Sequence, residues 1–281
     1  MSSVQGPWIT HVIAHRGHAK ARLHVMAGIV DYGKAASVYE RGRALAPEDL
    51  RHWKSVIDSF VDTRRTTVVD VGSGTGIFTR AWCSWGSHQV FACEPSPAMR
   101  REALQAGWPA GAAMVAAKAE QLPLAADVID VMWLSTVLHH ITDRNAWAAE
   151  AGRVLKRGGW LFVRNQFSEL GKTPWSEVLP GWERASEVFP RLSDVAELLA
   201  FHGLDLVDSL EVAESSRNQS PQAVAGWIRR MRSADSLLLA FSDEEINVGL
   251  DRLESFPTGH VLEPLQVGLA IFRVADGKGG L

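Results

Sequence analysis

The sequence predicts an α/β fold: a Rossmann-like, seven-stranded, mostly parallel sheet with helices on both faces. From Thr66 onward, short apolar runs alternate with helix-like stretches, as in parallel βαβ units. The first apolar run passes directly into glycines at alternate positions and then into a helix-like stretch. The 281 residues, 46% of them hydrophobic and 22% charged, can bury a full core and do not require a second domain.

Each expected strand is a short apolar or alternating run. The strands are Thr67–Val71, Gln89–Cys93, Ala113–Ala117, Val128–Leu134, Gly159–Val163, Leu204–Val212 and one within Val261–Val274. The helices expected among them are Thr75–Trp85, Pro97–Ala106, Arg144–Leu155 and Ser193–His202. Lys156–Gly159 is interpreted as a helix stop, because basic residues precede a glycine that can adopt a left-handed cap.

Two regions fall outside this alternation. Residues 1–65 are expected to be a helical extension before the main domain, residues 66–281, and residues 214–256 a helical insertion before the last strand. The helices predicted in these regions are Pro47–Val61, Ala223–Met231 and Ser242–Leu253, the last with a Ser-Asp-Glu-Glu start. Both additions would lie above the carboxyl ends of the strands, where open α/β sheets bind ligands. They form either a partial cap over a substrate pocket or a contact between subunits of a homo-oligomer.

Composition argues against several classes of protein. The formal net charge of −3 lacks the basic surplus that a nucleic-acid partner requires. Cys83 and Cys93 are the two cysteines, and their spacing supports neither a disulfide framework nor a zinc site, so we expect no metal. No stretch approaches the roughly 18 apolar residues of a membrane span, and the first residues do not resemble a secretory signal. We therefore expect a cytoplasmic protein.

The turn after the first strand suits the close approach of a ligand. Val68–Val71 runs into Gly72-Ser73-Gly74-Thr75-Gly76, and a helix follows. Residues without a Cβ let a ligand pass close over the strand end, and the helix offers unpaired N–H groups and a positive dipole end. Ile77 stands where the dinucleotide fingerprint requires its third glycine, which disfavours a nicotinamide-dependent oxidoreductase. The residues expected at the ligand are Asp70, Gly72, Ser73, Gly74 and Gly76.

A second motif follows the second strand. Glu94 stands at the strand end, where a carboxylate can accept hydrogen bonds from both hydroxyls of a ribose, and Pro95-Ser96-Pro97-Ala98-Met99 follows it. With these two motifs the chain resembles the class I S-adenosylmethionine-dependent methyltransferases. Their first strand ends in Asp or Glu before G-x-G-x-G, and their second ends in an acid often followed by x-S-x-x-M. The resemblance implies S-adenosyl-L-methionine as cofactor, S-adenosyl-L-homocysteine as product, and Glu94 and Pro95 at the ribose.

Two further stretches extend the resemblance. Ala117–Leu124 is similar to the family's G-D-A-E-x-L-P-F, which frames the adenine and implies contacts at Ala119 and Glu120. Lys118 departs from the usual acid, and a lysine cannot accept the hydrogen bonds of the adenine amino group. Asp127–Ile141 is similar to the F-D-x-V-x-x-x-x-x-L-H-H segment of the ubiquinone/menaquinone-methyltransferase-like branch, which implies Ser135 near the cofactor.

The N-terminal part carries a weaker likeness. Tyr32 and Tyr39 lie in a stretch that resembles the family's Y-D-x-x-A-x-x-Y-x-x-x-R entry segment. There an aromatic ring often covers the methionine end of the cofactor, whereas packing between helices is the alternative role. Altogether the resemblance extends over Tyr32 to Val163, about half the chain.

Methyl transfer from a sulfonium is an in-line displacement, so alignment and desolvation can supply most of the acceleration. A general base is needed only where the acceptor must lose a proton. His139 and His140 are the candidates for this base, and structural packing is their alternative role. Glu169 could remove a proton if methylation of an alkene created a carbocation. The aromatic residues around Glu169 suit an apolar or flat acceptor.

The leading hypothesis is therefore a methyltransferase acting on a carbon or oxygen of a small molecule, such as a specialised metabolite. N-methylation of a small amine and a cofactor-binding module without catalysis are the alternatives. The acceptor itself is left open, because a fold does not fix a function.

Overall fold

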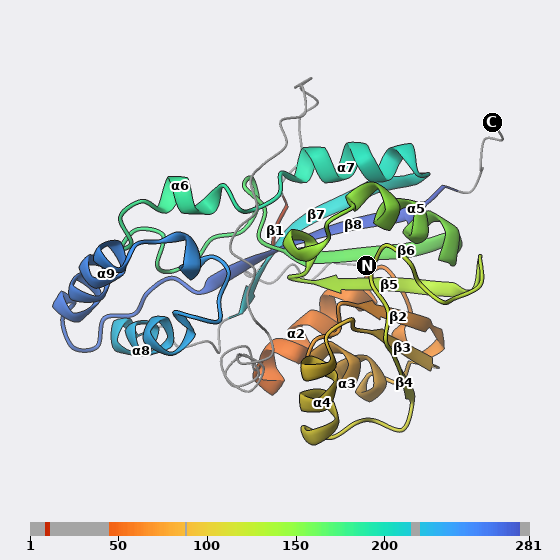
Figure 1. The fold of residues 1–281 in the computed structure, drawn as a ribbon, viewed down its shortest axis with the longest axis horizontal. Helices are drawn as coiled ribbons and strands as arrows, with labels where there is room; N and C mark the ends of the chain where they lie inside the picture. Colours follow the sequence, from red (N-terminus) through yellow and green to blue (C-terminus); the bar gives the residue numbers. More distant parts are fainter. Residues whose placement is uncertain (1–8, 12–44, 88, 215–219, 276–281) are drawn as a thin grey trace, which may run out of the picture.

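The computed structural model describes residues 9–11, 45–87, 89–214 and 220–275. Its centre is a sheet of strand order β1-β7-β8-β6-β5-β2-β3-β4 (Figure 1). The seven predicted strands are confirmed as β2 (Thr67–Val71), β3 (Gln89–Cys93), β4 (Ala112–Val115), β5 (Ile129–Ser135), β6 (Leu155–Asn165), β7 (Leu204–Glu214) and β8 (Leu265–Val274). Strands β2 to β6 pair in parallel, and β8 runs antiparallel between β6 and β7. The Rossmann-like, mostly parallel sheet is therefore confirmed.

An eighth strand lies at one edge of this sheet. β1 (Ile9–His11) pairs antiparallel with β7, Ile9 lying opposite Val212. The prediction that residues 1–65 are helical is wrong at these three residues. The outer side of β7 presents backbone N–H and C=O groups that an extended segment can satisfy. The division of the chain at residue 65 stays a prediction.

The helices follow the predicted order. They are α2 (Pro47–Asp58), α3 (Ile77–Ser84), α4 (Pro97–Gln105), α5 (Arg144–Val154), α6 (Trp182–Ser186), α7 (Leu192–Phe201), α8 (Pro221–Met231) and α9 (Asp243–Ser255), with short 3₁₀ turns η1 (Thr63–Arg65), η2 (Leu138–His140) and η3 (Leu238–Ala240). In Figure 1, α5 and α7 lie on one side of the sheet, and α2, α3 and α4 on the other. Helix α2 confirms the helix predicted to start at Pro47.

Two hydrophobic cores result from the alternation of side chains along the strands. On β5, Val131 and Trp133 face the core that includes Trp53 of α2, whereas Met132 faces the core that includes Trp147 of α5. The side chains of all five are completely buried. Helix α2 is therefore part of the sheet's own packing, although it precedes the first strand of the main domain.

The prediction of a helix stop at Lys156–Gly159 is wrong. Helix α5 already ends at Val154, and the four residues lie within β6. The pairing of β5 with β6 shifts register here, between Ile129 opposite Leu155 and Val131 opposite Trp160. Gly158 does adopt the left-handed backbone conformation, with φ +67°, but it does so inside this irregularity. The glycine was recognised correctly, and its structural context was not.

Residues 172–189 and 220–256 form a helical unit, named the helical cap, that follows the carboxyl ends of β6 and β7. Its role over a substrate pocket or at a subunit contact stays a prediction. Figure 1 shows α6, α8 and α9 gathered beyond that end of the sheet. Trp175 stacks on Trp227 with ring centroids 4.7 Å apart. Gly249 of α9 lies so close to Leu179 that a Cβ there would stand 2.3 Å from its Cδ2. These contacts bind the two segments into one unit.

Two features are absent from the described residues. No helix among them is both long enough and apolar enough to cross a membrane. Over the same ranges, no three His, Cys, Asp or Glu side chains lie together in a way that could hold a metal ion.

Candidate functional site

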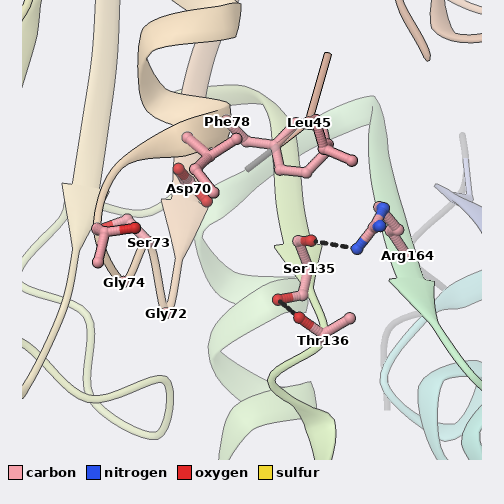
Figure 2. A pocket seen from close by; sticks show the side chains of 11 residues that line it. Leu45, Asp70, Gly72, Ser73, Gly74, Phe78, Ser135, Thr136 and Arg164 are labelled. Atoms are coloured by element: carbon pink, nitrogen blue, oxygen red, sulfur yellow. Dashed lines mark hydrogen bonds between the residues drawn. The ribbon is translucent and has the colours of Figure 1, made fainter. Parts of the chain in front are cut away.

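A cleft of about 490 Å³ opens at the carboxyl ends of β2, β5 and β6. Parallel sheets bind ligands at this edge. Of the residues predicted to bind cofactor, five line it: Asp70, Gly72, Ser73, Gly74 and Ser135. The others that line it are Leu45, Thr75, Ile77, Phe78, Thr136 and Arg164. Figure 2 shows the glycine turn on one side of the cleft and Arg164 on the other.

The glycine turn between β2 and α3 presents its backbone to the cleft. Gly72, Gly74 and Gly76 all have positive φ, and Gly76 is the N-cap of α3. A Cβ on Gly72 would stand 2.4 Å from Cγ2 of Val137, in the segment that follows β5. The N–H groups of Gly72 and Ser73 donate to the carbonyl of Cys93, which ties the turn to the tip of β3. The turn is thus closed to side chains at Gly72 and is fixed from two neighbouring strands.

Glu94 lies directly beneath this turn. Its carboxylate accepts hydrogen bonds from the N–H of Gly74 at 2.9 Å and of Ser96 at 2.7 Å. Burial raises the pKa of Glu94, although these two backbone hydrogen bonds act in the opposite direction. A carboxylate has lone pairs for about four hydrogen bonds, so two remain after these contacts. Glu94 does not itself line the cleft, and its contact with a ribose stays a prediction. Pro95 is exposed, and its carbonyl accepts from Arg100.

Asp70 lines the cleft from the end of β2, yet it is almost wholly buried. Thr79 donates its hydroxyl to Oδ2 of Asp70 at 2.6 Å. Burial raises the pKa of Asp70 to about 7, outweighing the opposite effect of the Thr79 hydrogen bond. The group therefore titrates near neutral pH.

The loop expected at the adenine is held by contacts within the protein. Ala119 is buried. Oε1 of Glu120 accepts from the N–H of Thr142 at 3.1 Å and of Asp143 at 3.4 Å, which ties this loop to the start of α5. Neither Ala119 nor Glu120 lines the cleft, and Lys118 is exposed. Their predicted contact with cofactor stays a prediction.

The histidine pair meets the helical cap. His139 and His140 lie on η2 with ring centroids 3.9 Å apart. Nε2 of His139 lies 3.1 Å from the hydroxyl of Ser236, a residue of the cap between α8 and η3. The histidines follow the strand end that carries Ser135 but do not themselves line the cleft. Their role as a general base stays a prediction.

The structure does not bring Glu169 to the cleft. Its carboxylate accepts from the N–H of Leu192 at 2.9 Å and from Nε of Arg191 at 3.2 Å, at the beginning of α7. An acid is favourable there because the first N–H groups of a helix have no partner within the helix. Tyr32 and Tyr39 lie outside the described residues.

A buried ion pair at the cleft was not among the predicted site residues. Arg164, at the end of β6, lines the cleft and pairs with Glu214, the last residue of β7. Nη1 of Arg164 donates to Oγ of Ser135 at 3.0 Å, and Nε1 of Trp53 donates to Glu214 at 3.2 Å. The Arg164 guanidinium lies 5.2 Å from the ring centroid of Trp53 and 5.4 Å from that of Phe78. The sequence does place Arg164, a polar residue, directly after an apolar strand, and this position indicates a residue at the ligand-binding edge of the sheet.

Thr136, the residue after β5, is held in a conformation that β-branched residues rarely adopt. Its φ is +53°, and its N–H donates to the carbonyl of Arg164 at 2.7 Å. Strain of this kind persists where the surroundings enforce it, and it is common at functional sites.

The part of the chain that contains the glycine turn and Glu94 is similar to known methyltransferases. Residues 69–163 match a methyltransferase domain family. The chain is 33% identical over 125 residues to the ubiquinone/menaquinone biosynthesis C-methyltransferase of Acidiphilium cryptum, covering 43% of this chain and 50% of that one. It is 30% identical over 159 residues to the malonyl-[acyl-carrier protein] O-methyltransferase of Laribacter hongkongensis, covering 52% and 51%. This chain thus spans about half the length of each relative.

A solved structure agrees on the fold. It is described as a candidate methyltransferase from an antibiotic biosynthesis pathway of Anabaena variabilis, and it has a TM-score of 0.64. The match covers 80% of this chain and 97% of that one, and its 18% identity makes it a likeness of fold alone. Together with the glycine turn, Glu94 and the strand order, these matches confirm the resemblance predicted from the sequence. Residues 69–163 are a methyltransferase domain of the class I fold, whose cofactor is S-adenosylmethionine.

Proposed function

We propose that this protein transfers the methyl group of S-adenosylmethionine to a carbon or an oxygen of a small molecule. The observation that carries the proposal is the glycine turn held over the carboxylate of Glu94, at the edge of the cleft where the parallel strands end. The matched domain spans both features. The names of the two relatives, a C-methyltransferase and an O-methyltransferase, support carbon or oxygen as the receiving atom.

The residues at the cleft fit this cofactor. A Cβ at Gly72 would overlap with Val137, so the turn keeps its compact shape beside the cleft only with glycine at this position. The positive end of the α3 dipole next to the turn and the remaining lone pairs of Glu94 suit a nucleoside with a charged amino-acid tail. When bound, the cofactor supplies a methyl group already activated by a positive sulfur.

The chain's own task is then to align the reactants and exclude water. In-line displacement needs the acceptor held at contact distance on the side opposite the leaving sulfur, and alignment of this kind supplies much of the acceleration. Leu45, Ile77 and Phe78 line the cleft with apolar surface, and one segment of the helical cap follows β6, whose end also borders the cleft. His139 would act as a base only for an acceptor that loses a proton.

Calorimetry with S-adenosylhomocysteine tests the proposal. We expect the wild type to bind it, and NADH to show no binding. Glu94→Gln should bind it about tenfold or more weakly, because one charged hydrogen-bond acceptor for the sugar is lost. Glu102→Gln, on the neighbouring helix α4, is the matched control and should bind normally.

Mass spectrometry then separates an enzyme from a binding module. Incubation with isotopically labelled S-adenosylmethionine and small-molecule extracts should give a product carrying one labelled methyl group. Failure of the wild type to bind S-adenosylhomocysteine would refute the proposed cofactor. Binding without any labelled product from carbon or oxygen acceptors would favour the binding module, and labelled amines would favour N-methylation.

A further inference from the structure

The cleft has two chemically different sides, and only one suits the cofactor. On the first side, the backbone of the glycine turn faces the cleft and contacts the carboxylate of Glu94 through the N–H of Gly74. On the other, Arg164 projects toward the cleft beyond Ser135, as Figure 2 shows. Since a nucleoside would occupy the turn, the second side is left for the molecule that receives the methyl group. The inference below rests on the proposed function.

Arg164 is a charge whose position is fixed. It is 4% exposed, its partner Glu214 is completely buried, and Glu214 does not line the cleft. A ligand therefore meets the guanidinium and not the carboxylate. Ser135 on one side and the rings of Trp53 and Phe78 on the other hold the guanidinium in place.

The guanidinium also has N–H groups that Ser135 and Glu214 do not use. It carries five N–H groups, and Ser135 and Glu214 accept from one nitrogen each. Nε of Arg164 has no hydrogen-bond partner among the residues that the structure describes. Because Nε is buried, an oxygen atom of a ligand would instead accept from the second N–H of a terminal nitrogen, since Ser135 and Glu214 leave one on each.

The surroundings define the rest of the ligand. Leu45 and Phe78 add apolar surface beside Arg164. An ammonium group would face the fixed positive charge of Arg164, and the sulfonium would add a second like charge. A carbonyl, phenolate or enolate oxygen would complement both.

We propose that Arg164 binds an oxygen atom of the methyl acceptor, and that the acceptor is a flat, apolar molecule with a phenolic, enolic or carbonyl oxygen. That oxygen is either the atom methylated or is conjugated to the carbon methylated. Glu214 is a positioning residue, because it fixes the guanidinium from behind without reaching the ligand. A fixed cation beside the bound oxygen also favours its ionised form.

4-Nitrophenol and benzylamine serve as matched probes, one carrying an acidic oxygen and the other an ammonium group. Each is titrated into protein saturated with S-adenosylhomocysteine, and the ionisation of bound nitrophenol is followed by its absorbance. In the wild type we expect nitrophenol to bind as phenolate with a lowered pKa, and benzylamine to bind more weakly.

Variants assign the effect to the guanidinium. Arg164→Met combined with Glu214→Gln removes both charges together, so that neither is left buried alone, and should weaken nitrophenol binding about 10- to 100-fold without lowering its pKa. Arg164→Lys should give an intermediate result, because lysine keeps the charge without the planar fork. Arg273→Met is the control, since Arg273 also lies 5.2 Å from a ring centroid, that of Trp160, but is exposed and outside the cleft.

The outcomes separate the two proposals. Equal binding of phenolate by the wild type and the double variant, absence of phenolate binding by the loaded wild type, or tighter binding of benzylamine would overturn the inference. Loss of S-adenosylhomocysteine affinity in the double variant would also overturn it, by placing Arg164 at the cofactor. Lack of S-adenosylhomocysteine binding by the wild type itself would instead overturn the proposed function on which the inference rests.

Discussion

Replacing Gly72 by alanine tests whether the turn after β2 is closed to side chains. Two penalties add up at this position. The backbone has φ +68°, which disfavours an L-residue by about 1–2 kcal/mol. The new Cβ would stand 2.4 Å from Cγ2 of Val137, and overpacking of this kind costs about 1–3 kcal/mol. Together the two penalties should lower the free energy of unfolding of Gly72→Ala by about 2–5 kcal/mol. Alanine also restricts the unfolded chain, and this effect offsets about 0.4–1 kcal/mol of that loss.

Gly203→Ala isolates the steric part of this loss. Gly203 has φ +80°, and no atom lies within 4 Å of its hypothetical Cβ. The two variants share the backbone penalty and the effect on the unfolded chain. The difference between their free energies of unfolding, measured by urea denaturation, should be about 1–3 kcal/mol.

A second substitution makes the test stricter. Val137→Ala removes both Cγ atoms, so Gly72→Ala should cost less in that background than in the wild type, with an interaction energy of about 0.5–3 kcal/mol. Equal destabilisation by Gly72→Ala and Gly203→Ala, or no relief from Val137→Ala, would refute the reasoning. S-adenosylhomocysteine affinity, measured on the same variants, should fall for Gly72→Ala alone.

Two other groups at the cleft give further predictions. The Asp70 carboxyl, whose pKa burial raises to about 7, stays protonated in the folded protein while it ionises in the unfolded chain, so stability falls as pH rises from about 4 to about 7. This fall is about 4 kcal/mol at most, and urea denaturation across the range should show it reduced in Asp70→Asn; an unchanged slope would exclude Asp70 as the cause. Glu214→Ala leaves Arg164 buried without its partner and should lower the free energy of unfolding by about 3–5 kcal/mol. Glu254→Ala, which breaks the exposed pair with Arg229, should cost roughly 0–1 kcal/mol in the same denaturation assay, and similar losses for both would contradict a buried role for Glu214.

The predictable part of the site is the part encoded locally. The bounds of β2 and β3 agree with those predicted from the sequence, because each is an apolar run that ends at a glycine or at an acid followed by proline. The glycines after β2 and the acid after β3 each follow their strand within a few residues. Parallel neighbours then bring these strand ends together, as the contact between Glu94 and Gly74 illustrates.

The rest depends on contacts that no local pattern contains. Glu214 meets Arg164 across 50 residues of sequence, although β8, which comes later in the chain, lies between their strands in the sheet. His139 meets Ser236 across 97 residues. Neither pairing follows from helical or strand periodicity, so the buried ion pair and the contact of the cap were not predicted.

Acids near helix starts show a different limit. Glu120 and Glu169 were assigned to cofactor and catalysis from their neighbours in the sequence. In the structure their carboxylates accept from the backbone N–H groups of Thr142 and Leu192, at or just before helix starts. The first N–H groups of a helix need acceptors, so an acid near a helix start can have this structural role instead of a functional one. Sequence alone could not decide which demand each acid meets.

The backbone of Thr136 carries strain that another residue type would avoid. A glycine or an asparagine would adopt its positive φ with less strain than threonine does. The threonine side chain nevertheless stands at the wall of the cleft, next to Ser135 and Arg164. Replacing Thr136 by glycine or asparagine should therefore raise the stability of the folded protein. The same replacement would change the wall of the cleft, so the gain in stability should come with a loss of activity.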